Sequence, residues 1–103
     1  MRSRVFAVAL AIAPIATSAH GQSPDRGLVF ARANCARCHA IDRSSDSPLQ
    51  AAPPFRSLHK RYRIDALAEA LAEGITTGHP AMPEFILTPA QIGDLLSFLK
   101  TLE

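Results

Sequence analysis

Cys35-Ala36-Arg37-Cys38-His39 is the stretch around which this chain is organised. Two thiols with two residues between them, and an imidazole directly after the second, form the pattern of a c-type haem attachment site. Each thiol can add to one vinyl group of the porphyrin, and one turn of backbone reaches both. The imidazole is then held under the ring, where its Nε2 can bind iron. The motif predicts one covalent haem c, linked through Cys35 and Cys38, with His39 as a metal ligand.

A close cysteine pair has three other common uses: a thiol oxidoreductase site, a zinc site and a disulfide. A thiol oxidoreductase needs a strand–helix–strand setting and a lowered thiol pKa, and no strand-like alternation flanks the pair. Zinc normally takes four ligands, and the chain has only two cysteines. A disulfide between residues so close would close too short a loop to be useful. The histidine directly after Cys38 favours haem over all three.

Residues 1–21 are expected to form a secretory signal peptide. Basic residues precede an apolar run over residues 5–15, and small residues follow it. This order is typical of a cleaved export signal, with cleavage after Ala19 or Gly21. The run has about ten residues, short of the about 20 that span a bilayer, so an uncleaved membrane anchor is the weaker alternative. We expect one domain over residues 22–103, exported to the periplasm.

The composition of the remaining chain is consistent with a small haem protein. Eleven Lys and Arg, less the two before residue 5, leave nine, which equals the nine Asp and Glu. This balance argues against nucleic acid or an anionic membrane as a partner. A single domain of this size has little core of its own. The chain has no Trp and one Tyr, so a haem would supply apolar bulk that side chains do not.

The first helix is expected over residues 24–34. Ser23 is a typical N-cap, and Pro24 suits the first helical position. Gly27 is unfavourable inside a helix, so we expect it to permit the close approach of another helix.

The last helix is the clearest in the chain and is expected within residues 88–102. Thr88 and Gln91 form a capping box, with a proline at the first helical position. Apolar residues recur at helical spacing, at Ile92, Leu95, Leu96, Phe98, Leu99 and Leu102. We expect this helix to cross the first one near Gly27 and Phe30.

The middle of the chain is expected to form a long loop and one further helix. Residues 40–54 are rich in turn formers and end in two prolines, which favours a loop, and a haem edge would be a reason for its length. Phe55 follows as a buried candidate and haem contact. Residues 64–73 have the apolar spacing of an amphipathic helix, which Gly74 would end. Ile75 is the next candidate haem contact.

A dense basic run follows the long loop. Its members are Arg56, His59, Lys60, Arg61 and Arg63. They could dock an acidic partner or anchor the haem propionates, but charge runs are often only a solvated helix face. Tyr62 could donate a hydrogen bond to a propionate or cover the core.

Met82 is the candidate sixth ligand of the iron. It is the only methionine after the first residue, and two prolines flank it in an irregular stretch. A thioether held opposite His39 would complete six-coordinate iron and raise its potential. Taken alone, such a methionine would more often fill a gap in the core. His79, in the same stretch, is the competing ligand, and His59 is a weaker one.

Taken in order, these features resemble a class I cytochrome c over nearly all of residues 22–103. The resemblance is carried by residues 27–30, the Cys-x-x-Cys-His motif, the two prolines at 53 and 54, residues 67–74, Ala81-Met82-Pro83 and residues 95–102. It implies a small all-α cytochrome c fold of about three to five short helices around one covalent haem, with the N- and C-terminal helices crossing.

The resemblance also implies roles for single residues. Cys35 and Cys38 would be the thioether links, and His39 and Met82 the axial ligands. The Pro53 carbonyl would orient His39 through its Nδ1–H, as expected for a ligating imidazole.

Two features depart from the family pattern. Ala31 stands four residues before Cys35, where many relatives carry an aromatic residue, and we expect Phe30 beside it to substitute. Because the chain has no tryptophan to reach a propionate, that role is open to Arg61, Arg43 or Tyr62.

The resulting functional prediction is an exported, monomeric carrier of single electrons, not an enzyme. Its partners would be redox proteins that dock at an exposed haem edge through a small, weak interface. A haem subunit of a periplasmic dehydrogenase or oxidase complex is a close variant. If Met82 is not a ligand, an open-site haem enzyme or gas-binding protein becomes the alternative, and a chain without covalent haem would favour the thiol oxidoreductase.

Overall fold

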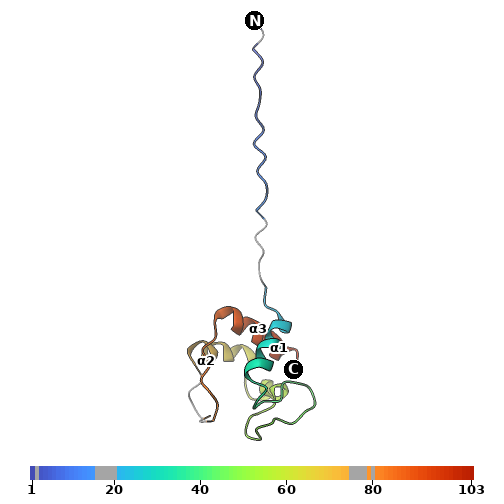
Figure 1. Ribbon diagram of the computed structural model, residues 1–103, viewed down its shortest axis with the longest axis vertical. Coiled ribbons are helices and arrows are strands. Elements are labelled where there is room, and N and C mark those ends of the chain that lie inside the picture. Colours follow the sequence, from blue (N-terminus) through green and yellow to red (C-terminus); the bar gives the residue numbers. More distant parts are fainter. Residues whose placement is uncertain (2, 16–20, 75–78, 80) are drawn as a thin grey trace.

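The computed structural model describes residues 1, 3–15, 21–74, 79 and 81–103. Its elements, drawn in Figure 1, are α1 (Pro24–Asn34), the 3₁₀ helices η1 (Phe55–Lys60) and η2 (Ile64–Ala66), α2 (Leu67–Glu73) and α3 (Pro89–Lys100). These residues contain no strand. The predicted all-α fold of short helices is therefore confirmed.

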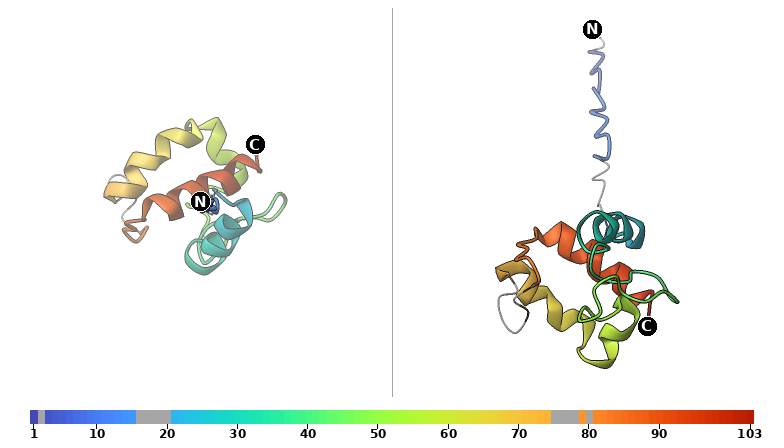
Figure 2. Two further views of the ribbon diagram at one scale, coloured as in Figure 1. Left: turned by 90° about the horizontal axis from the view of Figure 1, so that it is seen from above. Right: turned by 60° about the horizontal axis from the view of Figure 1, so that its bottom comes forward.

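The first and last helices cross, and this is the most extensive contact between two elements. Figure 2 shows α1, in teal, lying across α3, in red. Gly27 lies at the crossing, where a Cβ atom would stand 2.0 Å from the Asp94 carbonyl oxygen and 2.7 Å from Phe98 Cβ. The missing side chain thus lets the two backbones meet, and the predicted crossing near Gly27 is confirmed.

Both long helices begin at the predicted caps. The Ser23 hydroxyl accepts a hydrogen bond from the Arg26 N–H at 3.1 Å, and a proline follows Ser23. In the capping box of α3, the Gln91 N–H donates to Thr88 Oγ1 at 3.3 Å and the Thr88 N–H donates to Gln91 Oε1 at 2.9 Å. Each cap satisfies N–H groups that have no partner inside the helix.

A clasp holds the start of α1 on the middle of α3. The Asp94 carboxylate accepts hydrogen bonds from the Ser23 N–H at 2.8 Å and from Arg26 Nε at 2.9 Å. Beside it the Gln22 side chain lies so close over Gly93 that a Cβ there would meet its Cγ at 2.9 Å. We call these contacts of Asp94 the Asp94 clasp.

Replacing Asp94 by asparagine is expected to weaken the fold at neutral pH but not in acid. The hydrogen bond from Arg26, and then that from Ser23, lower the pKa of Asp94. Because its folded pKa lies below the unfolded value of about 3.9, the clasp stabilises above that value and is lost as pH falls through the folded pKa. Urea midpoints of the two proteins should differ at pH 7 and converge as the pH falls through the lowered pKa of the folded-state Asp94. Asp46→Asn, in the exposed loop, is the control. Its urea midpoint should equal that of the wild type both at neutral pH and in acid.

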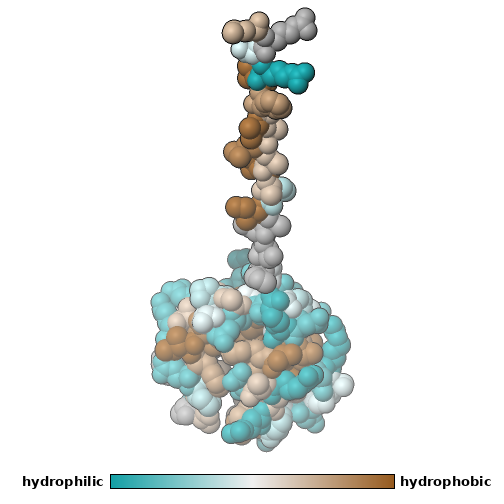
Figure 3. Space-filling model, turned by 45° about the horizontal axis from the view of Figure 1, so that its top comes forward, coloured by the Kyte–Doolittle hydropathy of each residue, from teal (hydrophilic) through white to brown (hydrophobic). Residues whose placement is uncertain are grey.

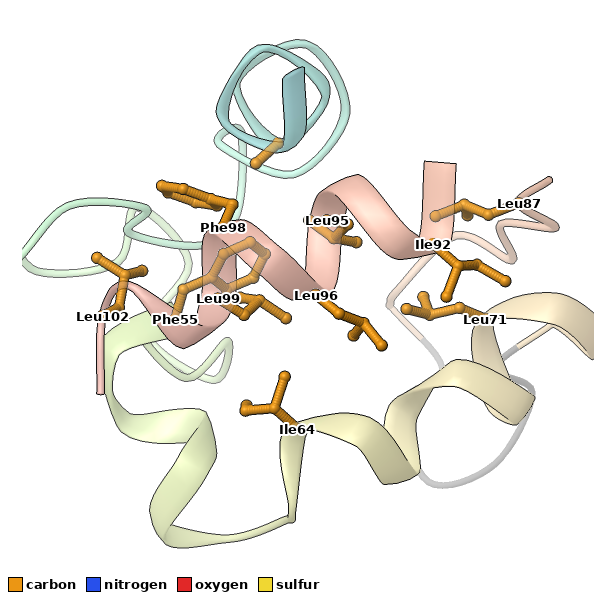
Figure 4. Close-up of a cluster of buried hydrophobic side chains, with 11 residues drawn as sticks. Phe55, Ile64, Leu71, Leu87, Ile92, Leu95, Leu96, Phe98, Leu99 and Leu102 are labelled. Atoms are coloured by element: carbon orange, nitrogen blue, oxygen red, sulfur yellow. The ribbon is translucent and has the colours of Figure 1, made fainter. Parts of the chain in front are cut away.

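The core lies along α3, where α1, α2 and η1 pack against it (Figure 4). Its buried members are Ala31, Phe55, Ile64, Leu71, Leu87, Ile92, Leu95, Leu96, Phe98, Leu99 and Leu102. All six apolar positions predicted for the last helix belong to it. The most buried large side chain among them is Leu99, at 3% exposure. Further apolar side chains, including Phe30 and Cys35, pack against this core while partly exposed.

The segment predicted as one helix over residues 64–73 is divided in the structure. Ile64–Ala66 form the 3₁₀ helix η2, and the α-helix begins only at Leu67. Arg63 precedes η2 without giving it a side-chain cap, and the tighter 3₁₀ turn is common at such helix ends. The end is as predicted: Gly74, with φ +99°, donates its N–H to the Ala70 carbonyl at 2.8 Å.

Residues 40–54 form the predicted loop, and hydrogen bonds fix its course. The Ala40 N–H donates to Ser47 Oγ at 3.0 Å, and the Leu49 N–H donates to the Cys38 carbonyl at 3.1 Å. At its end the Phe55 N–H donates to the Ala40 carbonyl at 2.9 Å. These hydrogen bonds hold the loop and its end against the cysteine motif.

Residues 3–15 run extended and exposed outside the helical body. Their apolar side chains, brown in Figure 3, contribute nothing to the core; Val5 and Ile15 are 90% and 89% exposed. Of the helices in the described residues, none combines the length and the apolar character needed to cross a membrane.

Candidate functional site

The cysteine motif forms a turn that continues directly from α1. The Cys35 N–H donates to the Ala31 carbonyl at 2.8 Å, and the His39 N–H donates to the Cys35 carbonyl at 2.9 Å. Both thiols are free and half-buried. The turn therefore holds two thiols and the imidazole together on one short piece of backbone, beside the core that Cys35 contacts.

The imidazole of His39 is oriented by the end of the long loop. Its Nδ1 lies 2.7 Å from the Pro53 carbonyl oxygen, so the contact predicted between these two residues is present. An Nδ1–H that donates to this carbonyl leaves Nε2 as the nitrogen that can bind a metal. The Phe55 ring lies against the imidazole, with centroids 5.0 Å apart and planes tilted by 43°. Pro53 and Phe55 thus hold the ring from two sides.

The electrostatics of the thiols oppose the thiol oxidoreductase reading. Burial, with a smaller effect of the neighbouring Cys38, raises the pKa of the Cys35 thiol to about 11. A reactive thiol needs a lowered pKa, because the thiolate is the nucleophile. Among the described residues, no three His, Cys, Asp or Glu side chains are grouped so that they could hold a metal ion.

Met82 lies in the segment between α2 and α3. It is half-buried, and its N–H donates to the His79 carbonyl at 2.9 Å. His79 itself is exposed. The segment is attached to the body at its far end, where the Leu87 N–H donates to the Leu71 carbonyl at 2.9 Å and Leu87 is buried. The described part of this segment is free of helix, as predicted.

Three of the other predicted haem contacts, Arg61, Tyr62 and Arg43, lie in the described residues. Arg61 is exposed, and Tyr62, 47% exposed, lines a hollow beside the end of α3. The Arg43 side chain donates to the Thr101 carbonyl. Ile75 lies outside the described residues.

The groups that fasten the long loop to the cysteine motif have no distinctive pattern in the sequence. Ser47 binds the Ala40 N–H, and the Leu49 backbone binds the carbonyl of Cys38. The only available signal was the serine within a run of turn-forming residues, a type that often bonds to nearby backbone.

These residues fit a covalently attached haem. Two free thiols can form thioethers, and an imidazole with Nδ1 on a carbonyl presents Nε2 to iron. In electron-transfer haem proteins a methionine thioether commonly binds the iron opposite such an imidazole, and Met82 is the candidate in this chain. Fold and donor set together define a small all-α protein of the c-type haem class.

Comparison with known proteins gives the family. Residues 25–103, most of the chain, match the family model described as cytochrome c. The chain therefore belongs to the cytochrome c family. With one attachment motif and an all-α fold, it is a class I, mono-haem member, and its cofactor is haem c with iron.

Two relatives are similar over most of their length. Cytochrome c-552 of Bradyrhizobium diazoefficiens is 29% identical over 99 residues, which cover 96% of this chain and 93% of that protein. A cytochrome c-553-like protein of Synechocystis sp. is 35% identical over 78 residues, which cover 76% of this chain and 68% of that protein. The similarity to the first extends over almost the whole chain.

Proposed function

We propose that this cytochrome c carries single electrons between redox proteins, with haem linked at Cys35 and Cys38 and iron bound by His39 and Met82. The observation that carries the proposal is the 2.7 Å contact between His39 Nδ1 and the Pro53 carbonyl. It presents Nε2 as the free donor of an imidazole that directly follows two free thiols.

The Pro53 carbonyl has a defined task in this proposal. As acceptor of the Nδ1–H, it keeps His39 in one tautomer and raises the basicity of Nε2. Since the backbone bond between Phe55 and Ala40 fastens the same loop, the carbonyl has little freedom to move. A ligand that keeps its position in both oxidation states minimises rearrangement during electron transfer. When bound, haem iron supplies the change between ferrous and ferric states.

Whether Met82 binds the iron distinguishes an electron carrier from a haem protein with an open sixth position. A thioether from residue 82 would fill the remaining axial position and raise the potential. With both axial positions occupied by protein, no site is left for a substrate or gas, so we propose a carrier rather than an enzyme. The half-buried position of Met82, in a segment fastened to α2 through Leu87, supports this role.

Further haem contacts are proposed on the same basis. The Phe55 ring beside His39 is well placed to pack against a porphyrin. Arg61 and Tyr62 stay proposed propionate partners, and Ile75 stays a proposed apolar contact. Arg43 is less suited, because its guanidinium already donates to the end of α3.

We also propose that residues 1–21 are removed on export to the periplasm, where a monomer then works with its redox partners. Apolar side chains that are almost fully exposed, as at Val5 and Ile15, are unfavourable in a mature protein. The contrast with Gln22 and Ser23, which pack on α3, supports a boundary in this region.

The attachment site is tested by removing one thiol at a time in a host that matures c-type cytochromes. The intact mass of the wild type should equal one haem plus a chain beginning at His20 or Gln22. Cys35→Ala and Cys38→Ala should each keep one thioether, and the vinyl group left on the ring should move the ferrous absorption bands to longer wavelength. The double variant should carry no covalent haem.

Arg37→Ala is the matched control, because it lies between the two cysteines and supplies no link. It should keep the mass increment and the spectrum of the wild type. Covalent haem in the double variant would disprove the assignment, and a mature product that retains residues 1–21 would disprove the export proposal.

A further inference from the structure

The long loop holds the backbone of Ala40, the residue directly after His39, at both of its polar groups. The Ala40 N–H donates to Ser47 Oγ at 3.0 Å, and the Ala40 carbonyl accepts from the Phe55 N–H at 2.9 Å. Ala40 is buried, at 5% exposure, so solvent has little access to replace a lost partner. The Ser47 hydroxyl therefore fixes the peptide group that His39 shares with Ala40.

The same bonds bring the end of the loop to the imidazole. Pro53, whose carbonyl oxygen lies 2.7 Å from His39 Nδ1, stands two residues before Phe55. Because Phe55 is bonded to the Ala40 carbonyl, His39 and Pro53 belong to one small ring of contacts that closes through Ala40 and Phe55. The hydroxyl of Ser47 braces this ring from the middle of the loop.

Ser47 is held in place by bonds on either side of it. It is half-buried, and two residues after it the Leu49 N–H donates to the Cys38 carbonyl at 3.1 Å. Two residues before it, the Ser45 carbonyl accepts a hydrogen bond from Arg56 Nη1 at 2.6 Å. These attachments leave the hydroxyl little freedom to turn away from the backbone that it binds.

We propose that Ser47 is a positioning residue for His39, the proposed ligand of the iron. Its hydroxyl holds the Ala40 backbone, which holds Phe55, and the Pro53 carbonyl is thereby kept on the Nδ1–H. A hydrogen bond from Nδ1–H makes the imidazole a stronger donor at Nε2. Stronger donation favours ferric iron and lowers the reduction potential. The inference rests on the proposed function, because it takes His39 as the ligand.

Ser47→Ala, in the mature, haem-loaded protein, is the test. Without the hydroxyl the buried Ala40 N–H loses its partner, so the loop should open more often and expose the Nδ1–H of His39. Solvent exchange of this proton, followed by NMR of the ferrous protein, should become about two- to tenfold faster, as the loss of one hydrogen bond predicts. The reduction potential should rise. Ser47→Thr, which keeps a hydroxyl, should restore both values.

Ser23→Ala is the matched control, because it also removes a serine hydroxyl that accepts a backbone N–H, here that of Arg26 at 3.1 Å. It should lower the urea midpoint but leave the exchange of the His39 Nδ1–H and the potential at their wild-type values. If Ser47→Ala also lowers only the urea midpoint, Ser47 serves the fold alone and the proposal is overturned. Equal shifts of the potential in the two alanine variants would overturn it as well.

A measurement on the wild-type protein tests the same link without a variant that has to fold. The Ala40 amide proton and the His39 Nδ1–H should be exposed by one opening of the loop, so urea should lower their protection from exchange with the same slope. Different slopes would overturn the proposal. A failure of His39 as the iron ligand would instead appear in the visible spectrum of the wild type, so the two failures are distinguishable.

Discussion

Replacing Met82 by alanine is expected to convert a closed, six-coordinate haem into a five-coordinate haem with an open sixth position. Without the thioether, the sixth position should become accessible, so that carbon monoxide binds readily to the ferrous variant and poorly to the wild type. The reduction potential should fall on the order of 0.1 V, because axial ligands set haem potentials over a wide range and methionine raises them. Visible spectra with and without carbon monoxide, and a redox titration, measure both effects.

Ile86→Ala is the control for this experiment. Ile86 is in the same segment and is 71% exposed, so its loss should leave spectrum, carbon monoxide affinity and potential unchanged. If Met82→Ala keeps the wild-type spectrum, residue 82 is not the ligand. His79→Ala then becomes the next variant to examine, and ready carbon monoxide binding by the wild type would favour an open-site haem protein.

Gly27→Ala is expected to destabilise the fold by about 2 kcal/mol or more, as overpacked contacts do. The new Cβ would stand 2.0 Å from the Asp94 carbonyl oxygen, which is backbone and cannot rotate away. The two helices would have to separate, although alanine favours a helix by about 1 kcal/mol over glycine. Urea unfolding of the haem-loaded protein measures the loss.

Gly93→Ala makes the same change in the other helix of the crossing. Its Cβ would meet the Gln22 side chain, at 2.9 Å from Cγ, and a flexible side chain can move. We therefore expect a change within about 1 kcal/mol, because the gain in helix propensity offsets the adjustment. Equal losses in the two variants would mean that the close approach at Gly27 is not what limits the crossing.

Sequence predicted the two long helices and their crossing because each depends on local signals. Ser23 and Thr88 are capping residues, a proline follows each, and the apolar residues of α3 recur at one period. The role of Gly27 could be predicted because a glycine retained inside a helix often permits the close packing of a neighbouring element. The partner of His39 came from family resemblance, and the 2.7 Å contact with Pro53 then supplied its geometry.

Other features depend on contacts between distant parts of the chain, which no local pattern contains. The Asp94 clasp joins Asp94 to Ser23 and Arg26, which lie 71 and 68 positions away in the sequence. An aspartate in a helix carries no sign of such a distant partner. The 3₁₀ start before Leu67 has the same apolar spacing as an α-helix, so periodicity could not separate the two. Where Arg61 and Tyr62 lie relative to a propionate depends on how η1 packs. The charge of Arg61 and the hydroxyl of Tyr62 do not reveal that packing.

The docking of Gln22 and Ser23 on α3 limits where a foreign N-terminal segment can be joined to this chain. The Ser97 hydroxyl donates to Gln22 Oε1 at 3.2 Å, and the Ser23 N–H donates to Asp94 at 2.8 Å. A fusion that resumes the native chain at Pro24 would delete both contacts and the helix cap. Recombinant versions should therefore keep residue 22 onwards and carry any purification tag upstream of a protease site that restores this beginning.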